Sequence, residues 1–290
     1  MKTAQETDKM LVQEKVPASL IIPGKKQEVI TYLTNGIEPE PLTEQEKNEI
    51  CRVINSNDYP QQIRPLVETL ANYTTIENLK LCSQNLPTLT IIEKKLFKFA
   101  FFKMFIVSGG CYDIKDNILT YKTDESIPHE FLHMASTPLD KNLNPYKSYT
   151  GFYSFSNREF SALGLNEGYT EMLANRIFKN ENYHTSSYRT NVYLMRLFEQ
   201  LYDTKEDMEN AYFNADCTSP IKQFLKYGTL EEYLDLLQDL DYYAECRIEN
   251  DEELESFYQL KKIIEKTEDN DRITAADEIT KEYYEYKKSR

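Results

Sequence analysis

Two of the three histidines in this 290-residue chain lie four residues apart, in the segment Ile127-Pro128-His129-Glu130-Phe131-Leu132-His133-Met134. Residues i and i+4 share one face of a helix, so the imidazoles of His129 and His133 can reach one metal ion. Glu130 follows the first histidine directly, where it can take a proton from a metal-bound water. The pattern His-Glu-x-x-His therefore predicts a zinc site on a helix.

A pair of glutamates further along the chain can complete this site. A catalytic zinc with two histidine ligands needs a third protein ligand and an open position for water. Glu167 and Glu171 lie four residues apart, hence on one helical face. Glu167 is the expected metal ligand, and Glu171 can accept a hydrogen bond from the far ring nitrogen of a ligand histidine. His184 is the alternative third ligand, but it lies among tyrosines and serines without a partner motif.

In these two segments the chain resembles the gluzincin metallopeptidases. That family carries His-Glu-x-x-His on one helix and Asn-Glu-x-x-x-Asp, or a close variant, on the next; here the second segment reads Asn166-Glu167-Gly168-Tyr169-Thr170-Glu171. The resemblance spans residues 111–178, with 34 positions from His133 to Glu167, a wider gap than in the best-known members, and with glutamate in place of the final aspartate. The metzincin pattern is excluded, because no glycine and third histidine follow His133 at the required spacing.

The resemblance implies a zinc-dependent peptidase with a zincin-like core. It implies that Glu130 is the general base, that Glu171 and Asn166 orient the ligands, and that the metal ligands are His129, His133 and Glu167. The oxyanion formed during hydrolysis usually needs one further protein donor. His184 and Tyr188 are the candidates, because both follow the Glu167 helix closely enough to fold back over the metal.

Short strands are expected just before the His-Glu-x-x-His helix, for which Ser126 is the expected N-cap and Pro128 suits the first turn. Residues 111–113 and 118–121 read as a hairpin around an Asp116-Asn117 turn. An edge strand beside the metal could pair with an extended peptide through backbone hydrogen bonds. The alternative is a hairpin that only covers the core.

The other elements are expected to be helical, which gives an α+β fold that is predominantly α. Thr43 and Glu46 form a capping-box pattern ahead of an apolar face made by Ile50, Val53 and Ile54. Further helices are expected over residues 63–73, 75–82, 89–104, 188–202, 208–212, 219–227, 230–240, 252–267 and 275–286. The corresponding division is an extended N-terminal segment (1–41), a helical part (42–104), the zincin-like catalytic core (105–205) and an acidic helical part (206–290).

An irregular crossover or short hairpin is expected over residues 136–161. It carries five aromatic residues, and these could line a substrate cleft or pack in the core. The five residues are Tyr146, Tyr149, Phe152, Tyr153 and Phe155.

Composition narrows the class of protein. The formal net charge is −14, and residues 231–290 carry 19 acidic and 9 basic groups, so nucleic acid is not an expected partner. No apolar run approaches the twenty residues of a membrane span, and the polar N-terminus has no signal-peptide pattern. The five cysteines are scattered and form no C-x-x-C pair, as is typical of reduced thiols. We therefore expect a soluble, cytoplasmic protein.

The sequence thus predicts a zinc-dependent peptidase acting on a peptide or protein substrate. The alternatives are a metal-binding scaffold without hydrolytic activity and a regulatory protease that cleaves a repressor-like partner. Glu130 favours hydrolysis, because a purely structural zinc site closes all four positions with protein ligands and has no use for a base.

Overall fold

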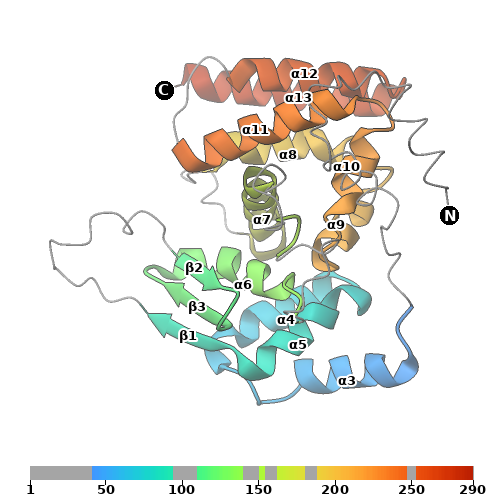
Figure 1. Cartoon of the computed structure of the whole chain (residues 1–290). Coiled ribbons are helices and arrows are strands. Elements are labelled where there is room, and N and C mark those ends of the chain that lie inside the picture. The colour runs from blue at the N-terminus through green and yellow to red at the C-terminus, as the bar shows by residue number, and fades with distance from the viewer. Residues whose placement is uncertain are drawn as a thin grey trace, which may run out of the picture.

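The computed structural model describes residues 41–93, 110–139, 150–153, 162–179, 188–246 and 253–289 (Figure 1). The expected extended segment (1–41), all but its last residue, and His184 lie outside this part of the chain. Within it the protein is rich in helix and has one small sheet. The α+β class, predominantly α, is therefore confirmed.

Three short helices open the described chain: α3 (Glu44–Ile54), α4 (Arg64–Tyr73) and α5 (Lys80–Asn85). Single 3₁₀ turns accompany them at Gln61–Ile63, Glu77–Leu79 and Leu86–Thr88. The predicted capping box is present, because the Thr43 hydroxyl accepts from the Glu46 amide and the Glu46 carboxylate accepts from the Thr43 amide. The predicted apolar face of α3 is buried. Local sequence signals thus set the start and orientation of this helix.

The sheet consists of β1 (Thr90–Glu93), β2 (Gly110–Asp113) and β3 (Ile118–Tyr121), in the order β1-β3-β2. Strands β2 and β3 form the predicted antiparallel hairpin, with Tyr112 opposite Leu119 and with Asn117 in the turn at a φ of 53°. Strand β1 runs parallel to β3. Among the described strands β2 lies at an edge of the sheet, as the sequence suggested.

The prediction of a helix over residues 89–104 is wrong in its first part. Residues 90–93 form β1, and residues 94–104 lie outside the described chain. Thr90, Ile91 and Ile92 are β-branched and fit a pleated surface. Strand β3 supplies the hydrogen-bonding partner, with Ile91 opposite Leu119, so tertiary pairing outweighs the helical spacing of the apolar residues.

Helix α6 (Ile127–Ala135) carries the His-Glu-x-x-His motif and packs against α5, β2 and β3. Pro128 lies in its first turn, as expected. The prediction of Ser126 as a side-chain cap is wrong. A 3₁₀ turn (Asp124–Ser126) leads into the helix, so the Ser126 backbone is already helical and its hydroxyl donates to the Thr123 carbonyl at 2.8 Å. Every residue from His129 to Ala135 is buried.

Seven further helices form the rest of the described chain, and each predicted C-terminal helix is present with somewhat different bounds. They are α7 (Leu163–Phe178), α8 (Arg189–Glu199), α9 (Lys205–Phe213), α10 (Thr218–Phe224), α11 (Leu230–Cys246), α12 (Glu253–Glu265) and α13 (Asn270–Lys288). Figure 1 shows α7 between the sheet with α6 on one side and the helices α8 and α11 on the other. Helix α7 is therefore the central element, in contact with both parts of the molecule.

Two glycines allow α7 to approach its neighbours closely. A Cβ atom on Gly164 would lie 1.9 Å from the Leu240 carbonyl oxygen of α11, and one on Gly168 would lie 2.7 Å from Cβ of Asn191 in α8. The Asn191 side-chain amide donates to the carbonyls of Gly164 at 3.1 Å and Leu240 at 2.9 Å. The Gly164 amide donates to Asp241 at 2.7 Å. These contacts fix the first turns of α7, which carry Glu167.

Aromatic side chains fill the core beneath α7. Phe152 is 2% exposed and packs against Tyr169 and Tyr212, so the core interpretation holds for this residue. Tyr153 is half-buried, and Tyr146, Tyr149 and Phe155 lie outside the described residues.

Among the described helices, none is both long and apolar enough to cross a membrane.

Candidate metal centre

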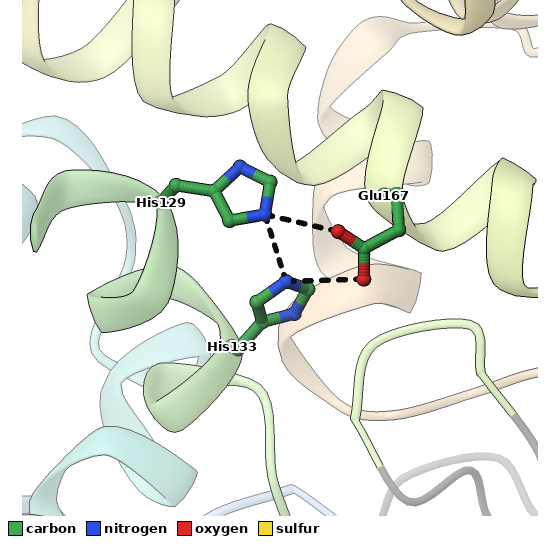
Figure 2. Close-up of side chains that lie close together, drawn as sticks. All are labelled: His129, His133 and Glu167. Carbon is green, nitrogen blue, oxygen red and sulfur yellow. Dashed lines mark hydrogen bonds and ion pairs between the residues drawn. The ribbon is translucent and has the colours of Figure 1, made fainter. Parts of the chain in front are cut away.

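The predicted ligands meet where α6 contacts α7. His129 and His133 project from one face of α6, and Glu167 reaches them from α7 (Figure 2). The two Nε2 atoms lie 3.0 Å apart. Oε2 of Glu167 lies 3.1 Å from Nε2 of His129, and its Oε1 lies 3.4 Å from Nε2 of His133. The helical spacing of the motif and the position of α7 thus bring three ligand atoms together.

The three side chains could hold one metal ion. Zinc bonds of about 2.0 to 2.2 Å place neighbouring tetrahedral ligand atoms about 3.3 Å apart. The two histidine nitrogens lie 3.0 Å apart, and each faces a different oxygen of Glu167, at 3.1 and 3.4 Å, so the carboxylate offers an oxygen near each histidine. Among the described residues these three form a group of metal-ligating type, with the ligand atoms all within 4.8 Å of one another. Two neutral nitrogens and one carboxylate oxygen are a donor set that zinc favours in catalytic sites.

Glu171 determines the protonation of His129. Its Oε2 lies 2.8 Å from Nδ1 of His129, and an ionised carboxylate only accepts hydrogen bonds. Nδ1 therefore donates to Glu171, and in the neutral form of the ring the lone pair lies on Nε2, which faces Glu167. This is the orientation that a ligand histidine needs, and Glu171 has the position expected from the sequence.

Asn166 lies behind the second histidine. Its oxygen accepts from the Phe152 amide at 3.0 Å, and its nitrogen lies 3.4 Å from Nδ1 of His133. In this amide orientation Nε2 of His133 carries the proton and donates within the cluster. A metal on Nε2 would move that proton to Nδ1, where the Asn166 oxygen would have to accept it. The Thr150 hydroxyl further holds the backbone of His133, at 3.0 Å from its carbonyl.

His129 and His133 are buried and Glu167 is partly buried, so the charges of these three side chains act strongly on one another. Burial opposes the charged form of His129, but the hydrogen bonds that the ring donates to Glu167 and Glu171 outweigh it and hold the pKa of the ring well above its ordinary value. Burial likewise opposes ionisation of Glu167, but the adjacent His133 and His129 outweigh it and lower the pKa of the carboxyl group. The ionised form of Glu167 is therefore favoured, as metal binding requires.

Glu130 lies beside the cluster without belonging to it. The residue is 8% exposed, and burial raises the pKa of its carboxyl group, against the effect of the neighbouring His129 and His133. Its side chain faces strand β2, where Cγ and Oε1 come close to Gly110. A carboxyl group in these surroundings is better able to hold a proton than one in water, which suits a general base.

Of the two proposed oxyanion donors, the structure describes one. The Tyr188 ring stacks on the His129 ring, with centroids 5.7 Å apart and an interplanar angle of 12°. Tyr188 directly precedes α8, and its ring lies beside His129 as the sequence suggested, while its role as an oxyanion donor stays a prediction. His184 lies outside the described residues, both as oxyanion donor and as alternative third ligand.

The sequence did not reveal the contact between Gly110 and Glu130. Gly109-Gly110 was visible only as a break before the hairpin, and nothing in the spacing linked it to a side chain of α6. The supporting position of Phe152, whose amide holds Asn166, was also missed because it depends on the path of the chain between α6 and α7.

No protein-family model, curated protein or solved structure matches this chain.

Proposed function

We propose that this protein is a zinc-dependent peptidase of the gluzincin type. The observation that carries the proposal is the convergence of His129, His133 and Glu167, whose charges act on the neighbouring Glu130 carboxyl group. The donor set is that of a catalytic zinc with three protein ligands, and Glu130 provides the base that such a site uses. The substrate of this reaction is a peptide or protein.

The residues around His129, His133 and Glu167 have different roles in the proposed amide hydrolysis. Bound zinc supplies a Lewis acid that polarises a carbonyl group and acidifies water. The Glu130 carboxylate accepts one proton from the water that attacks the carbonyl carbon. It then donates that proton to the leaving nitrogen as the C–N bond breaks, so that the base returns to its starting state. Glu171 keeps the His129 ring in the correct tautomer throughout.

We assign to Tyr188 the hydroxyl that would stabilise the developing negative charge. It reaches the cluster from the segment before α8 and stacks on the His129 ring. A phenol donor placed within hydrogen-bond distance of the oxyanion would stabilise it in the transition state. In this proposal Tyr188 acts in catalysis, and the tautomer of His129 is held by Glu171.

The test is hydrolysis of a peptide library, read by mass spectrometry, by zinc-loaded wild type and Glu130→Gln. The expected result is cleavage by wild type, none by Glu130→Gln, and one zinc per chain in both. Glu125→Gln is the matched control, because Glu125 is exposed in the turn before α6 and should cleave like wild type. Zinc in the wild type without any cleavage would favour the metal-binding scaffold, and cleavage by Glu130→Gln would remove the base assigned here.

A further inference from the structure

The first residue of strand β2 lies against the side chain of Glu130. A Cβ atom on Gly110 would lie 2.7 Å from Cγ, 2.8 Å from Oε1 and 3.1 Å from Cδ of Glu130. Non-bonded carbon atoms are normally about 3.5 to 4.0 Å apart. Any residue other than glycine would therefore compete with the Glu130 carboxyl group for the same space.

The need for glycine here is one of space, not of backbone conformation. Among the described glycines, Gly151 adopts a positive φ, and Gly110 does not. Gly110 pairs with Tyr121 in the antiparallel ladder, as an ordinary strand residue. An alanine could take this backbone conformation, and alanine is normally the more stabilising of the two residues inside a strand.

We propose that Gly110 is a positioning residue for the general base, because its missing side chain leaves the room in which the Glu130 carboxyl group lies against strand β2. The role of Gly110 in catalysis rests on the proposed function. The packing of Gly110 against Glu130 does not depend on that function.

The contacts of strand β2 oppose its displacement by a larger residue at position 110. Tyr112 is buried, and its hydroxyl lies 2.8 Å from the side-chain oxygen of Asn117. The Asn117 amide in turn donates to the Asn85 carbonyl at 2.8 Å. The hairpin is thus fixed to α5 as well as packed on α6. A side chain at position 110 would therefore displace Glu130, while the histidines on either side of it remain held by Glu171 and by the Thr150 contact.

A double-mutant cycle on thermal unfolding tests this contact without any assay of activity. The four proteins are wild type, Gly110→Ala, Glu130→Ala and the double variant, all measured metal-free and zinc-loaded. We expect Gly110→Ala to lower the unfolding midpoint of wild type and to leave unchanged or raise that of Glu130→Ala, in which Cγ and Oε1 are absent. Cys111→Ala is the matched control, because its exposed side chain lies on the opposite face of β2. If Gly110→Ala changed the unfolding midpoint equally in wild type and in Glu130→Ala, the proposal would be overturned.

The activity of Gly110→Ala tests whether Gly110 positions Glu130 for catalysis. A displacement of a reacting group by about 1 Å can lower the rate about 100-fold. We expect kcat to fall by about that factor, with KM and zinc content unchanged, while Cys111→Ala keeps wild-type kcat. Wild-type kcat in Gly110→Ala would overturn the proposal. If wild type itself cleaves no peptide, the proposed function fails, and the unfolding cycle still decides whether Gly110 positions Glu130.

Discussion

Glu171 offers a graded test of how the metal ligands are oriented. Its carboxylate lies 2.8 Å from Nδ1 of His129, and the side chains of Glu171 and His129 are only 13% and 10% exposed. Glu171→Ala removes the acceptor and its charge. Glu171→Gln keeps a carbonyl oxygen that can accept from Nδ1 and removes only the charge. The two variants therefore separate the hydrogen bond from the negative charge.

The size of the effect follows from this contact. A hydrogen bond involving a charged group contributes about 1.5 to 3 kcal/mol, and a neutral one about 0.5 to 1.5 kcal/mol. Since each 1.4 kcal/mol is about tenfold in affinity, Glu171→Ala should raise the Kd for zinc by about 10- to 100-fold. Glu171→Gln should raise it by about tenfold. This range agrees with the effect usual for residues that hydrogen-bond a ligand histidine.

The assay is competition for zinc against a chromophoric chelator at pH 7, for wild type, Glu171→Gln, Glu171→Ala and the exposed control Glu125→Gln. The expected order of Kd is wild type, then Glu171→Gln, then Glu171→Ala, with the control equal to wild type. A wild-type Kd in Glu171→Ala would refute the reasoning, because it would mean that His129 is oriented without Glu171.

Two further predictions concern stability. Free zinc at 100-fold above Kd stabilises the folded state by about 2.7 kcal/mol. Because each kcal/mol corresponds to about 2 to 4 °C in Tm, removing the zinc with a chelator should lower Tm by about 5 to 10 °C in calorimetry. An unchanged Tm would exclude a metal ion that joins α6 to α7. Gly164→Ala should lower the free energy of unfolding, measured in urea, by about 3 kcal/mol. The added Cβ would lie 1.9 Å from the Leu240 carbonyl oxygen. The resulting displacement would break the hydrogen bonds that Asn191 donates to Gly164 and Leu240. A wild-type urea midpoint would contradict the close packing of α7 on α11.

Features with a local cause were predictable from the sequence. The capping box of Thr43 and Glu46 depends on residues three apart, and the hairpin depends on a turn between two short alternating segments. The shared face of His129 and His133 depends only on the helical period. Each of these is present, because the interactions that produce it lie within a few residues of one another.

Features that depend on distant partners were not predictable in the same way. Strand β1 pairs with β3 across 28 positions, as in Thr90 opposite Ile118, and the helical spacing of its neighbours gave the wrong element. Ser126 does not cap α6, because an unforeseen 3₁₀ turn precedes it. The contact of Gly110 with Glu130 joins a strand to a helix, and no spacing rule reveals it.

Glu167 lies between these two cases. Its spacing from Glu171 is a local signal, and the resemblance to a known family suggested its role. Its distance from the histidines depends on how α7 packs against α8 and α11. That packing depends on Gly164, Gly168 and Asn191, and the sequence analysis predicted no packing role for any of them.

The central claim is that His129, His133 and Glu167 bind one metal ion, and metal content tests it most directly. Wild type and Glu167→Ala are purified without added metal, offered equimolar zinc, desalted and analysed by mass spectrometry of the elements. We predict one zinc per chain in wild type and a large loss in Glu167→Ala. No zinc in wild type, or equal zinc in both proteins, would contradict the assignment of the metal centre.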